Sequence, residues 1–217
     1  MSYKAIIFDL DGTLLDTLQD LANSVNTILS QKGFKEHPVD NFRFFVGEGI
    51  EVLVKKALPA DKAEGKYITG IVNEVKEEYS RRWSEHTRPY PGVPEMLDFL
   101  QERNIPKAIF SNKPHEFTTA TVEALLPGWD FTDVCGIKTG VSPKPDPQGA
   151  LFIAEKMQIK PEKIIYLGDT RTDMQTAVAG NFFPVGALWG FRPAEELLDS
   201  GARILAKSPQ DVIDLFH

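Results

Sequence analysis

The stretch IIFDLDGTLLD, Ile6–Asp16, places two carboxylates at the end of the most apolar segment in the early part of the chain. The run Ala5–Phe8 is continuous in apolar residues, which is typical of a strand buried on both faces, as in a parallel sheet. Asp9 and Asp11 follow directly, and buried carboxylates are costly to keep charged unless a cation or several donors compensate them. The stretch therefore predicts a buried strand that delivers charged groups to a site at its end.

Strands and helices alternate in the second half of the chain. The segment 88–94 contains three prolines and a glycine, which cannot continue a helix. Alternation of this kind builds an α/β fold with a parallel sheet and helices on both faces. The patterns predict strands over 107–111, near 134, over 163–167 and over 183–188, with helices over 95–103, 116–125, 148–157 and 172–179 and two weaker elements at the end.

Residues 16–86 have a different pattern. Apolar residues from 18 to 29 recur at helical spacing, and Gly33 is a plausible stop. The pattern stays helical from 40 to about 83, with polar joints at 47–49 and around Pro59, and no strand-like run interrupts it. We therefore expect residues 16–86, called here the helical insert, to be all-helical, and residues 1–15 and 87–217 to form the α/β core.

Composition and charge narrow the classes of function. The chain has 217 residues, 42% hydrophobic and 25% charged, as in ordinary soluble proteins. Its formal charge is 24 − 31 = −7, which argues against a nucleic-acid partner, and no apolar run reaches the roughly 18 residues that span a bilayer. A single cysteine, Cys135, cannot form an internal disulfide. We expect a cytoplasmic monomer or homodimer that binds neither nucleic acid nor membrane.

Polar residues follow the predicted strands where each strand ends. Because the carboxyl ends of parallel strands meet at one edge of a sheet, these residues should gather there. They are Asp9 and Asp11, then Ser111 and Asn112, then Lys144 in the loop 140–147, and finally Asp169 in YLGDTRTD.

The residue types at this edge suit a metal ion and a phosphate. Asp9 can offer a side chain and Asp11 a backbone carbonyl to one ion, while Asp169 and Asp173 are four apart at a helix start. Hard oxygen ligands of this kind suit Mg²⁺. Lys144, between two prolines, is a point cation for a phosphate and for Asp9. The hydroxyl of Thr13 lies beside the site, and Ser111 and Asn112, with N–H groups at a helix start, can hold phosphate oxygens.

Each motif also has a simpler interpretation when taken alone. The Asp9–Asp11 pair could be a helix cap and turn, and a Ser-Asn pair often initiates a turn. Lys144 alone would be a solvated side chain, and Asp173 a first-turn helix charge. An EF-hand loop is excluded because Leu14 stands where that loop needs glycine, and no P-loop motif follows any strand. The common position of the motifs at strand ends favours a functional site.

DLDGT, the Ser111–Asn112 pair, Lys144 in SPKPDP and GDTRTD resemble the four motifs of the haloacid dehalogenase-like phosphatases, over essentially the whole chain. PYPGV, FSNKP and the helical insert after the first motif resemble the phosphoglycolate phosphatase branch. The resemblance implies a Rossmann-like core, with residues 16–86 as a helical cap.

The resemblance also implies a mechanism. Asp9 would attack phosphorus and form an aspartyl-phosphate, while Asp11 would protonate the leaving alcohol and then deprotonate water. A carboxylate that attacks a dianionic phosphate needs cations, here Mg²⁺ and Lys144. The metal ligands would be Asp9, the Asp11 carbonyl and Asp169, with Asp173 bound directly or through water. The residues that would orient the phosphoryl group are Thr13, Ser111, Asn112 and Lys144.

The substrate depends on the helical insert. Arg43, in FRFFVGEGI, and Lys113 are candidates to meet the leaving group; the alternative for Arg43 is a surface cation on a helix. Gly47 and Gly49 form either a loop over the site or a simple helix break. We predict a magnesium-dependent phosphatase acting on a small phosphate monoester, with a phosphoglycolate-like substrate favoured. The alternatives are a sugar-phosphate mutase of the same superfamily and a non-catalytic phosphate-binding module.

Overall fold

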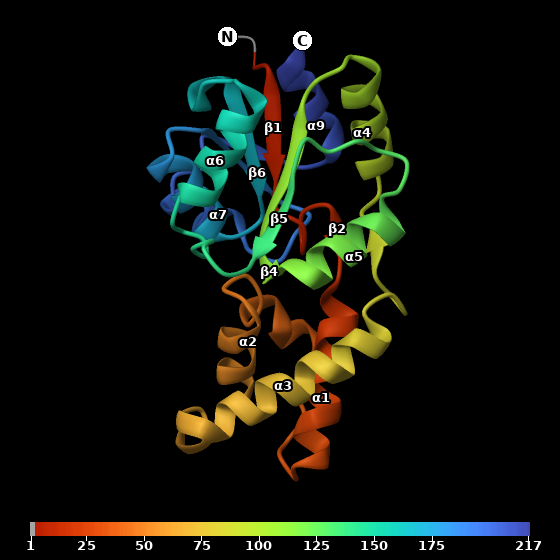
Figure 1. Cartoon of the computed structure of the whole chain (residues 1–217), viewed down its shortest axis with the longest axis vertical. Coiled ribbons are helices and arrows are strands. Elements are labelled where there is room, and N and C mark those ends of the chain that lie inside the picture. Colours follow the sequence, from red (N-terminus) through yellow and green to blue (C-terminus); the bar gives the residue numbers. More distant parts are fainter. Residues whose placement is uncertain (1–2) are drawn as a thin grey trace.

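A six-stranded parallel sheet forms the centre of the computed structural model, which describes residues 3–217 (Figure 1). The strand order is β5-β4-β1-β6-β7-β8. All four residues of β1 are fully buried, which confirms the buried strand predicted from their apolar run. The strands are β1 (Ala5–Phe8), β4 (Lys107–Pro114), β5 (Val134–Ile137), β6 (Ile164–Gly168), β7 (Phe183–Ala187) and β8 (Ile204–Ala206).

Helices cover both faces of this sheet, as the alternating pattern predicted (Figure 1). Successive side chains of a strand point to opposite faces. Ile6 and Phe8 of β1 therefore pack in one apolar cluster with α4 and α9, and Ile7 packs in another with α6 and α7. The bounds are α4 (Val93–Glu102), α5 (His115–Leu125), α6 (Gln148–Met157), α7 (Arg171–Ala179), α8 (Ala194–Asp199) and α9 (Pro209–Ile213).

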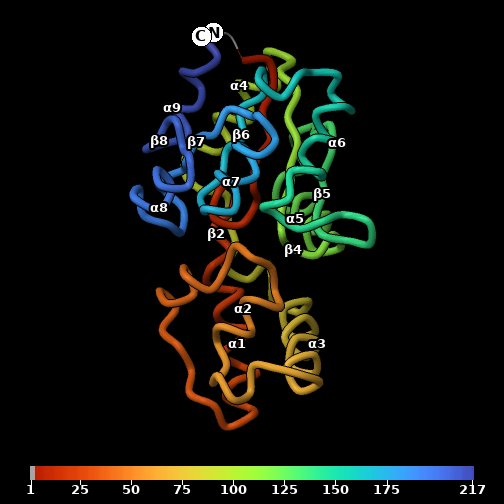
Figure 2. Tube along the Cα trace, turned by 90° about the vertical axis from the view of Figure 1, so that its left-hand side faces the viewer, coloured from red at the N-terminus to blue at the C-terminus, as the bar shows by residue number. Residues whose placement is uncertain are grey.

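The helical insert lies at the carboxyl edge of the sheet and has its own apolar cluster (Figure 1, Figure 2). Its apolar faces are directed at one another, so Leu21 and Val25 of α1 pack in the same cluster as Val75 and Tyr79 of α3. The helix α1 ends just before Gly33, which has φ +75°. The elements are α1 (Leu18–Gln31), α2 (Ile50–Ala57), α3 (Gly65–Arg82), and the 3-10 helices η1 (Val39–Phe44) and η2 (Ala60–Lys62).

The chain crosses between core and insert twice, at a short antiparallel ribbon. In this ribbon β2 (Leu15–Asp16) pairs with β3 (Arg88–Pro89). Two-residue strands are too short to show alternation, so the sequence pattern did not reveal them. The division into a core and a cap at residues 16 and 86 stays a prediction.

Two further details differ from the sequence expectations. The strand β4 continues to Pro114 instead of ending at Ser111, because its pairing with β5 shifts register between Phe110 and Pro114. The chain closes with α8, β8, α9 and a 3-10 helix, η4 (Asp214–Phe216), where two weaker elements were predicted.

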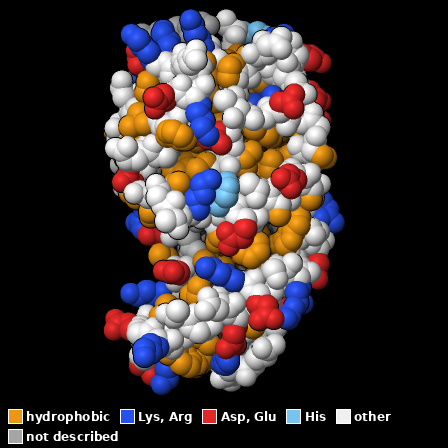
Figure 3. Space-filling view, in the orientation of Figure 1, with side chains coloured by type: hydrophobic (Ala, Val, Ile, Leu, Met, Phe, Trp, Pro, Cys, Tyr) orange, Lys and Arg blue, Asp and Glu red, His pale blue; other side chains and the backbone are white. Residues whose placement is uncertain are grey.

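Among residues 3–217, none of the helices combines the length and the apolar character that crossing a membrane requires. On the face seen in Figure 3, acidic and basic side chains are interspersed over both the core and the insert.

Candidate active site

The three central strands end at the same edge of the sheet, which faces the helical insert. Asp9 follows β1, Asp169 follows β6, and Ser111 lies near the end of β4. All three residues are buried, at 4%, 0% and 2% relative exposure. The structure therefore brings together groups that are up to about 160 positions apart in the sequence, as the strand-end argument predicted.

Three carboxylates form the centre of this edge. One carboxylate oxygen each from Asp9, Asp169 and Asp173 lies within 4.8 Å of the other two. Asp169 accepts hydrogen bonds from the Thr13 hydroxyl (3.0 Å) and from the backbone N–H of Phe191 (2.8 Å). The predicted Thr13 hydroxyl is therefore used to fix Asp169 in this arrangement.

Asp173 is held by the start of its own helix. Its Oδ2 accepts hydrogen bonds from the backbone N–H of Thr170 (3.0 Å) and from the Thr170 hydroxyl (2.6 Å), which forms a capping box on α7. The simple interpretation of Asp173 as a first-turn helix charge is thus correct for one oxygen. The other, Oδ1, faces the site and binds Lys144 at 2.6 Å.

Lys144 lies between two of the carboxylates. Its Nζ is 2.8 Å from Asp9 Oδ1 and 2.6 Å from Asp173 Oδ1, and the residue is only 4% exposed. Burial alone would lower the pKa of Lys144, but the Asp173 and Asp9 carboxylates raise it well above its ordinary value. The two carboxylates therefore favour the charged form of the lysine beside Asp9.

Asn112 positions the loop that carries Lys144. The Asn112 Oδ1 accepts a hydrogen bond from the Lys144 backbone N–H (2.7 Å), and Asn112 Nδ2 donates to the Lys144 carbonyl (3.2 Å) and to the Gly47 carbonyl (3.1 Å). Its amide is thus occupied by backbone groups in this arrangement. Ser111 lines the pocket, and its hydroxyl oxygen accepts a hydrogen bond from the Lys113 backbone N–H (3.2 Å).

The charge of the cluster calls for a cation. Burial first, and then the neighbouring carboxylates of Asp173 and Asp11, raise the pKa of Asp9 to about 7 against the opposing effect of Lys144. Burial also raises the pKa of Asp169 well above its usual range. Within the described residues Asp9 Oδ1 has no aligned hydrogen bond, although Lys144 is close.

A divalent cation fits this set of residues. With all groups ionised, the carboxylates of residues 9, 11, 169 and 173 exceed the two buried ammonium groups, of residues 113 and 144, by two negative charges. The donors that converge are all oxygen atoms, which hard cations prefer. A bound divalent cation would replace the protons that burial otherwise favours on Asp9 and Asp169.

Asp11 is held by a different lysine. Lys113 Nζ donates to Asp11 Oδ1 (2.9 Å) and Oδ2 (3.1 Å), and also to the hydroxyl of Tyr79 on α3 (2.7 Å). The side chain of Lys113 is 3% exposed. Although burial alone would lower the pKa of Lys113, Asp11 and Tyr79 raise it above its ordinary value. Lys113, predicted to meet the leaving group, is therefore part of a chain of contacts from the insert to Asp11.

A pocket opens between the sheet edge and the insert. Its lining residues surround about 480 Å³ of empty volume, part of which is open to solvent. The core side contributes polar groups, and the insert side is apolar. The lining residues are Asp9, Asp11, Ser111, Asn112, Lys113 and Pro114 from the core, and Leu21, Val46, Gly47, Gly49, Ile50 and Leu53 from the insert.

The loop 47–49 lies over the site, which was one of the two interpretations of its glycines; the other was a simple helix break. Gly47 accepts the hydrogen bond from Asn112, and both glycines line the pocket. At Gly49, where φ is +92°, an added Cβ would lie 3.4 Å from the Asn112 carbonyl oxygen. At Gly12, where φ is +88°, an added Cβ would lie 2.3 Å from Asp169 Oδ2, so the turn after β1 requires glycine.

Arg43 does not line this pocket. Its Nη1 donates to the Gly190 carbonyl in the loop after β7 (3.1 Å), and its Nε is 3.7 Å from Asp40. Nearby, Arg192 Nη2 donates to the Val46 carbonyl (2.8 Å). In this arrangement Arg43 links the insert to the core through the Gly190 carbonyl, and its role toward a ligand stays a prediction.

Several residues at the site were not predicted. Leu21, Leu53 and Tyr79 recur at helical spacing in the insert, which indicates only that they are buried. The spacing does not say whether a buried residue packs against its own helices or reaches the sheet edge. The hydroxyl of Tyr79 gave no separate signal, because tyrosine is common in apolar helix faces.

Comparisons with known proteins show which family has a sequence like this one. The sequence model of the haloacid dehalogenase-like hydrolase family matches residues 6–186. The phosphoglycolate phosphatase of Nitrosospira multiformis is 33% identical over 205 residues, which cover 90% of this chain and 88% of that protein. The phosphoglycolate phosphatase of Pseudomonas putida is 30% identical over 214 residues, or 97% of this chain and 76% of that protein.

A solved structure has the same fold. The crystal structure of a predicted phosphoglycolate phosphatase from Haemophilus somnus superposes with a TM-score of 0.91 at 24% identity, covering 100% of this chain and 99% of that one. The family match, the whole-length relatives and the arrangement of Asp9, Lys144 and Asp169 agree with one another. The two relatives described above are named phosphoglycolate phosphatases, and the chain belongs to the haloacid dehalogenase-like hydrolase family.

Proposed function

We propose that this chain hydrolyses a small phosphate monoester through an aspartyl-phosphate on Asp9. The observation that carries the proposal is the buried Asp9 carboxylate, 2.8 Å from the Lys144 ammonium, with Asp11 two residues along and facing the same pocket. A carboxylate attacks a dianionic phosphate only when cations offset the repulsion. A non-catalytic phosphate-binding module has no use for a second carboxylate at the position of Asp11.

In the first step an Asp9 oxygen forms a bond to phosphorus while the bond from phosphorus to the ester oxygen breaks. The leaving oxygen keeps the electron pair and takes a proton from the Asp11 carboxyl, so a neutral alcohol departs. Lys144 stays charged and offsets the negative charge of the phosphoryl group. Ser111 lines the pocket and orients the phosphoryl oxygens, while Thr13 holds Asp169 and Asn112 holds the loop of Lys144.

In the second step water attacks the phosphorus of the aspartyl-phosphate. The Asp11 carboxylate takes a proton from this water, the bond between Asp9 and phosphorus breaks, and inorganic phosphate leaves with both aspartates restored. Mg²⁺, held by Asp9, the Asp11 carbonyl and Asp169, with Asp173 bound directly or through water, would supply further positive charge at the phosphoryl oxygens when bound. The oxygen donors that converge on one point support this ligand set.

The favoured substrate is phosphoglycolate or a similarly small ester. One observation supports it: relatives at 30% and 33% identity are named phosphoglycolate phosphatases. Lys113 is the cation among the lining residues, and to meet a carboxylate on the leaving group it would have to exchange one of its contacts with Asp11 or Tyr79. The apolar side chains of Leu21, Ile50 and Leu53 would exclude water around that group.

We further propose that residues 1–15 and 87–217 carry the chemistry, and that residues 16–86 act as a cap that selects the substrate. Every residue assigned to phosphorus or metal lies outside the insert, while half of the pocket lining belongs to it. The ribbon of β2 and β3 is then the point about which the cap moves. The buried free thiol of Cys135 suits a reducing compartment, so we place the enzyme in the cytoplasm, as a monomer or homodimer.

Release of inorganic phosphate tests this proposal. Purified protein is incubated with phosphoglycolate, p-nitrophenyl phosphate and a panel of sugar phosphates, with and without Mg²⁺. Asp9→Asn should lower turnover at least about 10³-fold, because an amide keeps the volume but removes the nucleophile. Asp61→Asn, on the exposed turn η2, is the matched control and should leave turnover unchanged.

Two results would contradict the proposal. Turnover of Asp9→Asn within tenfold of wild type would remove Asp9 from the nucleophile role. If the phosphoryl group of the substrate is labelled, its return to a sugar phosphate, with little label released as inorganic phosphate, would identify a mutase instead.

A further inference from the structure

The hydroxyl of Tyr79 is the starting point. Tyr79 lies near the C-terminal end of α3, in the helical insert, and is 1% exposed. Its ring packs edge-on against Phe117 of α5, with centroids 5.3 Å apart. Its hydroxyl does not face solvent but accepts a hydrogen bond from Lys113 Nζ at 2.7 Å. A buried hydroxyl paired with a buried ammonium is a short, charge-assisted contact that fixes both groups.

The second contact of Lys113 leads to Asp11. The same Nζ donates to both Asp11 oxygens, at 2.9 and 3.1 Å, and lies 4.7 Å from the centre of the Tyr79 ring. Across residues 3–217, no other side chain hydrogen-bonds to the Asp11 carboxylate. The direction in which Asp11 points is therefore set by Lys113, and the position of Lys113 is set in turn by Tyr79.

Asp11 is the group whose orientation matters most for the leaving alcohol. In the proposed first step its proton must reach the ester oxygen as the bond to phosphorus breaks, and proton transfer of this kind depends on reach and direction. Its side chain is 12% exposed and lines the pocket, so it has room to rotate away if Lys113 is not held.

We propose that Tyr79 is a positioning residue for Asp11, acting through Lys113. The inference rests on the proposed function, because it assigns Tyr79 to the proton transfer between Asp11 and the leaving group. Since Tyr79 belongs to α3 and Lys113 to β4, the restraint exists only while the helical insert is docked on the sheet edge. Protonation of the leaving group is thereby coupled to the docked position of the insert.

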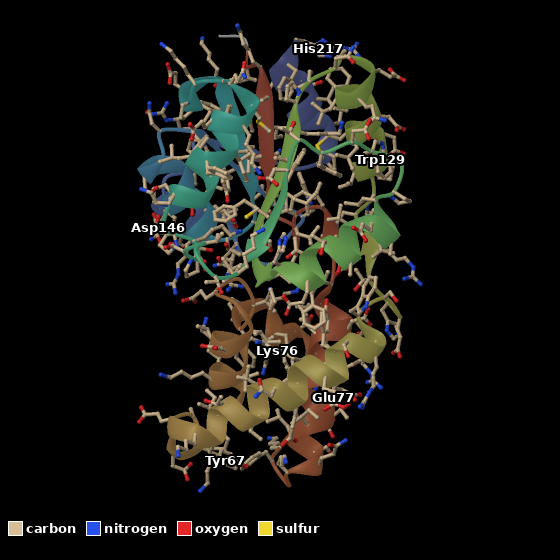
Figure 4. All side chains as sticks on the ribbon, viewed as in Figure 1. Tyr67, Lys76, Glu77, Trp129, Asp146 and His217 are labelled. Atoms are coloured by element: carbon tan, nitrogen blue, oxygen red, sulfur yellow. The ribbon has the colours of Figure 1, made fainter. Side chains whose placement is uncertain are left out.

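Tyr79→Phe separates this role from packing. Phenylalanine keeps the ring, its contact with Phe117 and its face toward Lys113, and removes only the oxygen. Tyr67→Phe is the matched control, because Tyr67 lies toward the start of α3, away from the sheet, and is 44% exposed (Figure 4). Urea unfolding of both variants shows whether either change alters the stability of the chain.

The measurement is kcat/KM for two esters, phosphoglycolate and p-nitrophenyl phosphate, in the presence of Mg²⁺. This ratio reports the steps up to departure of the leaving group, and so it excludes the water step that both esters share. The leaving oxygen of glycolate is strongly basic and must take the proton from Asp11 as it departs as an alcohol, whereas p-nitrophenolate leaves without one. Tyr79→Phe should lower kcat/KM roughly 10- to 100-fold for phosphoglycolate, the value of a lost charged hydrogen bond, and less than about threefold for the aryl ester.

Asp11→Asn completes the test as a double-mutant cycle. In that background Tyr79→Phe should cause no further loss on phosphoglycolate, because the group that it positions is gone. Equal losses on the two esters, or a further loss in the Asp11→Asn background, would overturn the inference and leave Tyr79 a packing residue. Absence of turnover by the wild-type protein on every ester would instead contradict the proposed function itself.

Discussion

Replacing Asp20 with asparagine should lower the free energy of unfolding by roughly 2–4 kcal/mol, although Asp20 does not line the pocket. Asp20 lies in the first turn of α1 and is fully buried. Its Oδ2 accepts hydrogen bonds from the Thr87 backbone N–H (2.9 Å), the Thr87 hydroxyl (2.8 Å) and the His86 backbone N–H (3.0 Å). Its Oδ1 is 2.8 Å from His86 Nδ1. The carboxylate thus links the start of α1, where the chain has just left the core, to residues 86–87, where the chain returns to it.

The magnitude follows from these contacts. Asparagine keeps the volume of the side chain but replaces one oxygen by an NH₂ group, which cannot accept a hydrogen bond. Whichever oxygen is replaced, donors at His86 or Thr87 lose their acceptor. One or two lost hydrogen bonds to a charged group cost roughly 2–4 kcal/mol in total. For a chain of this size the melting temperature should fall by roughly 5–15 °C.

The effect should depend on pH with a definite sign. Burial alone would raise the pKa of Asp20, but the donors of His86 and Thr87 outweigh it and hold the pKa below its ordinary 3.8. A carboxyl whose folded pKa is lowered contributes its full stability above the ordinary value and loses it as the pH falls through the folded one. The difference between wild type and Asp20→Asn should therefore be constant above pH 5 and shrink below pH 3.8.

Urea unfolding at pH 7, 5 and 3.5 measures this difference. Asp61→Asn, an exposed aspartate in the same insert, is the control and should change the free energy by less than about 0.5 kcal/mol. A loss for Asp20→Asn that also stays below about 0.5 kcal/mol at pH 7 would refute the reasoning. So would a difference that grows as the pH falls from 5 to 3.5.

Two other predictions concern the metal and Arg43. Mg²⁺ should raise the melting temperature of the wild type, and much less that of Asp169→Asn, because the cation replaces protons on buried carboxylates. Activity should vanish on chelation and return with Mg²⁺. Ca²⁺ should support activity poorly, because it prefers more ligands and longer bonds. Full activity after exhaustive chelation would contradict the proposal that the enzyme requires Mg²⁺. Arg43→Ala should lower kcat/KM equally for phosphoglycolate and p-nitrophenyl phosphate, since its guanidinium docks the insert on Gly190. A loss confined to phosphoglycolate would instead make Arg43 a ligand of the leaving group.

The sequence alone determined the strand-end chemistry. The apolar run Ala5–Phe8 indicated a buried strand, strand–helix alternation indicated the fold class, and the common position of the polar motifs at predicted strand ends indicated the place of the site. The helix over 148–157 agrees with α6 to the residue, because a period of apolar positions is a local property of the chain. The resemblance of four ordered motifs to one family was likewise available from the sequence, and the family match confirms it.

Only the tertiary structure decided which groups meet. Helical spacing indicates that Tyr79 is buried and gives no sign that Asp20 is, and it cannot say that Tyr79 reaches Lys113 or that Asp20 binds Thr87. In the same way, the sequence around Arg43 is compatible with binding a ligand and with binding a backbone carbonyl, and only the structure shows the contact with Gly190. The physical reason is that periodicity shows only which face of a helix or strand is buried. Which residue that face contacts depends on the strand order and on how the insert docks on the core.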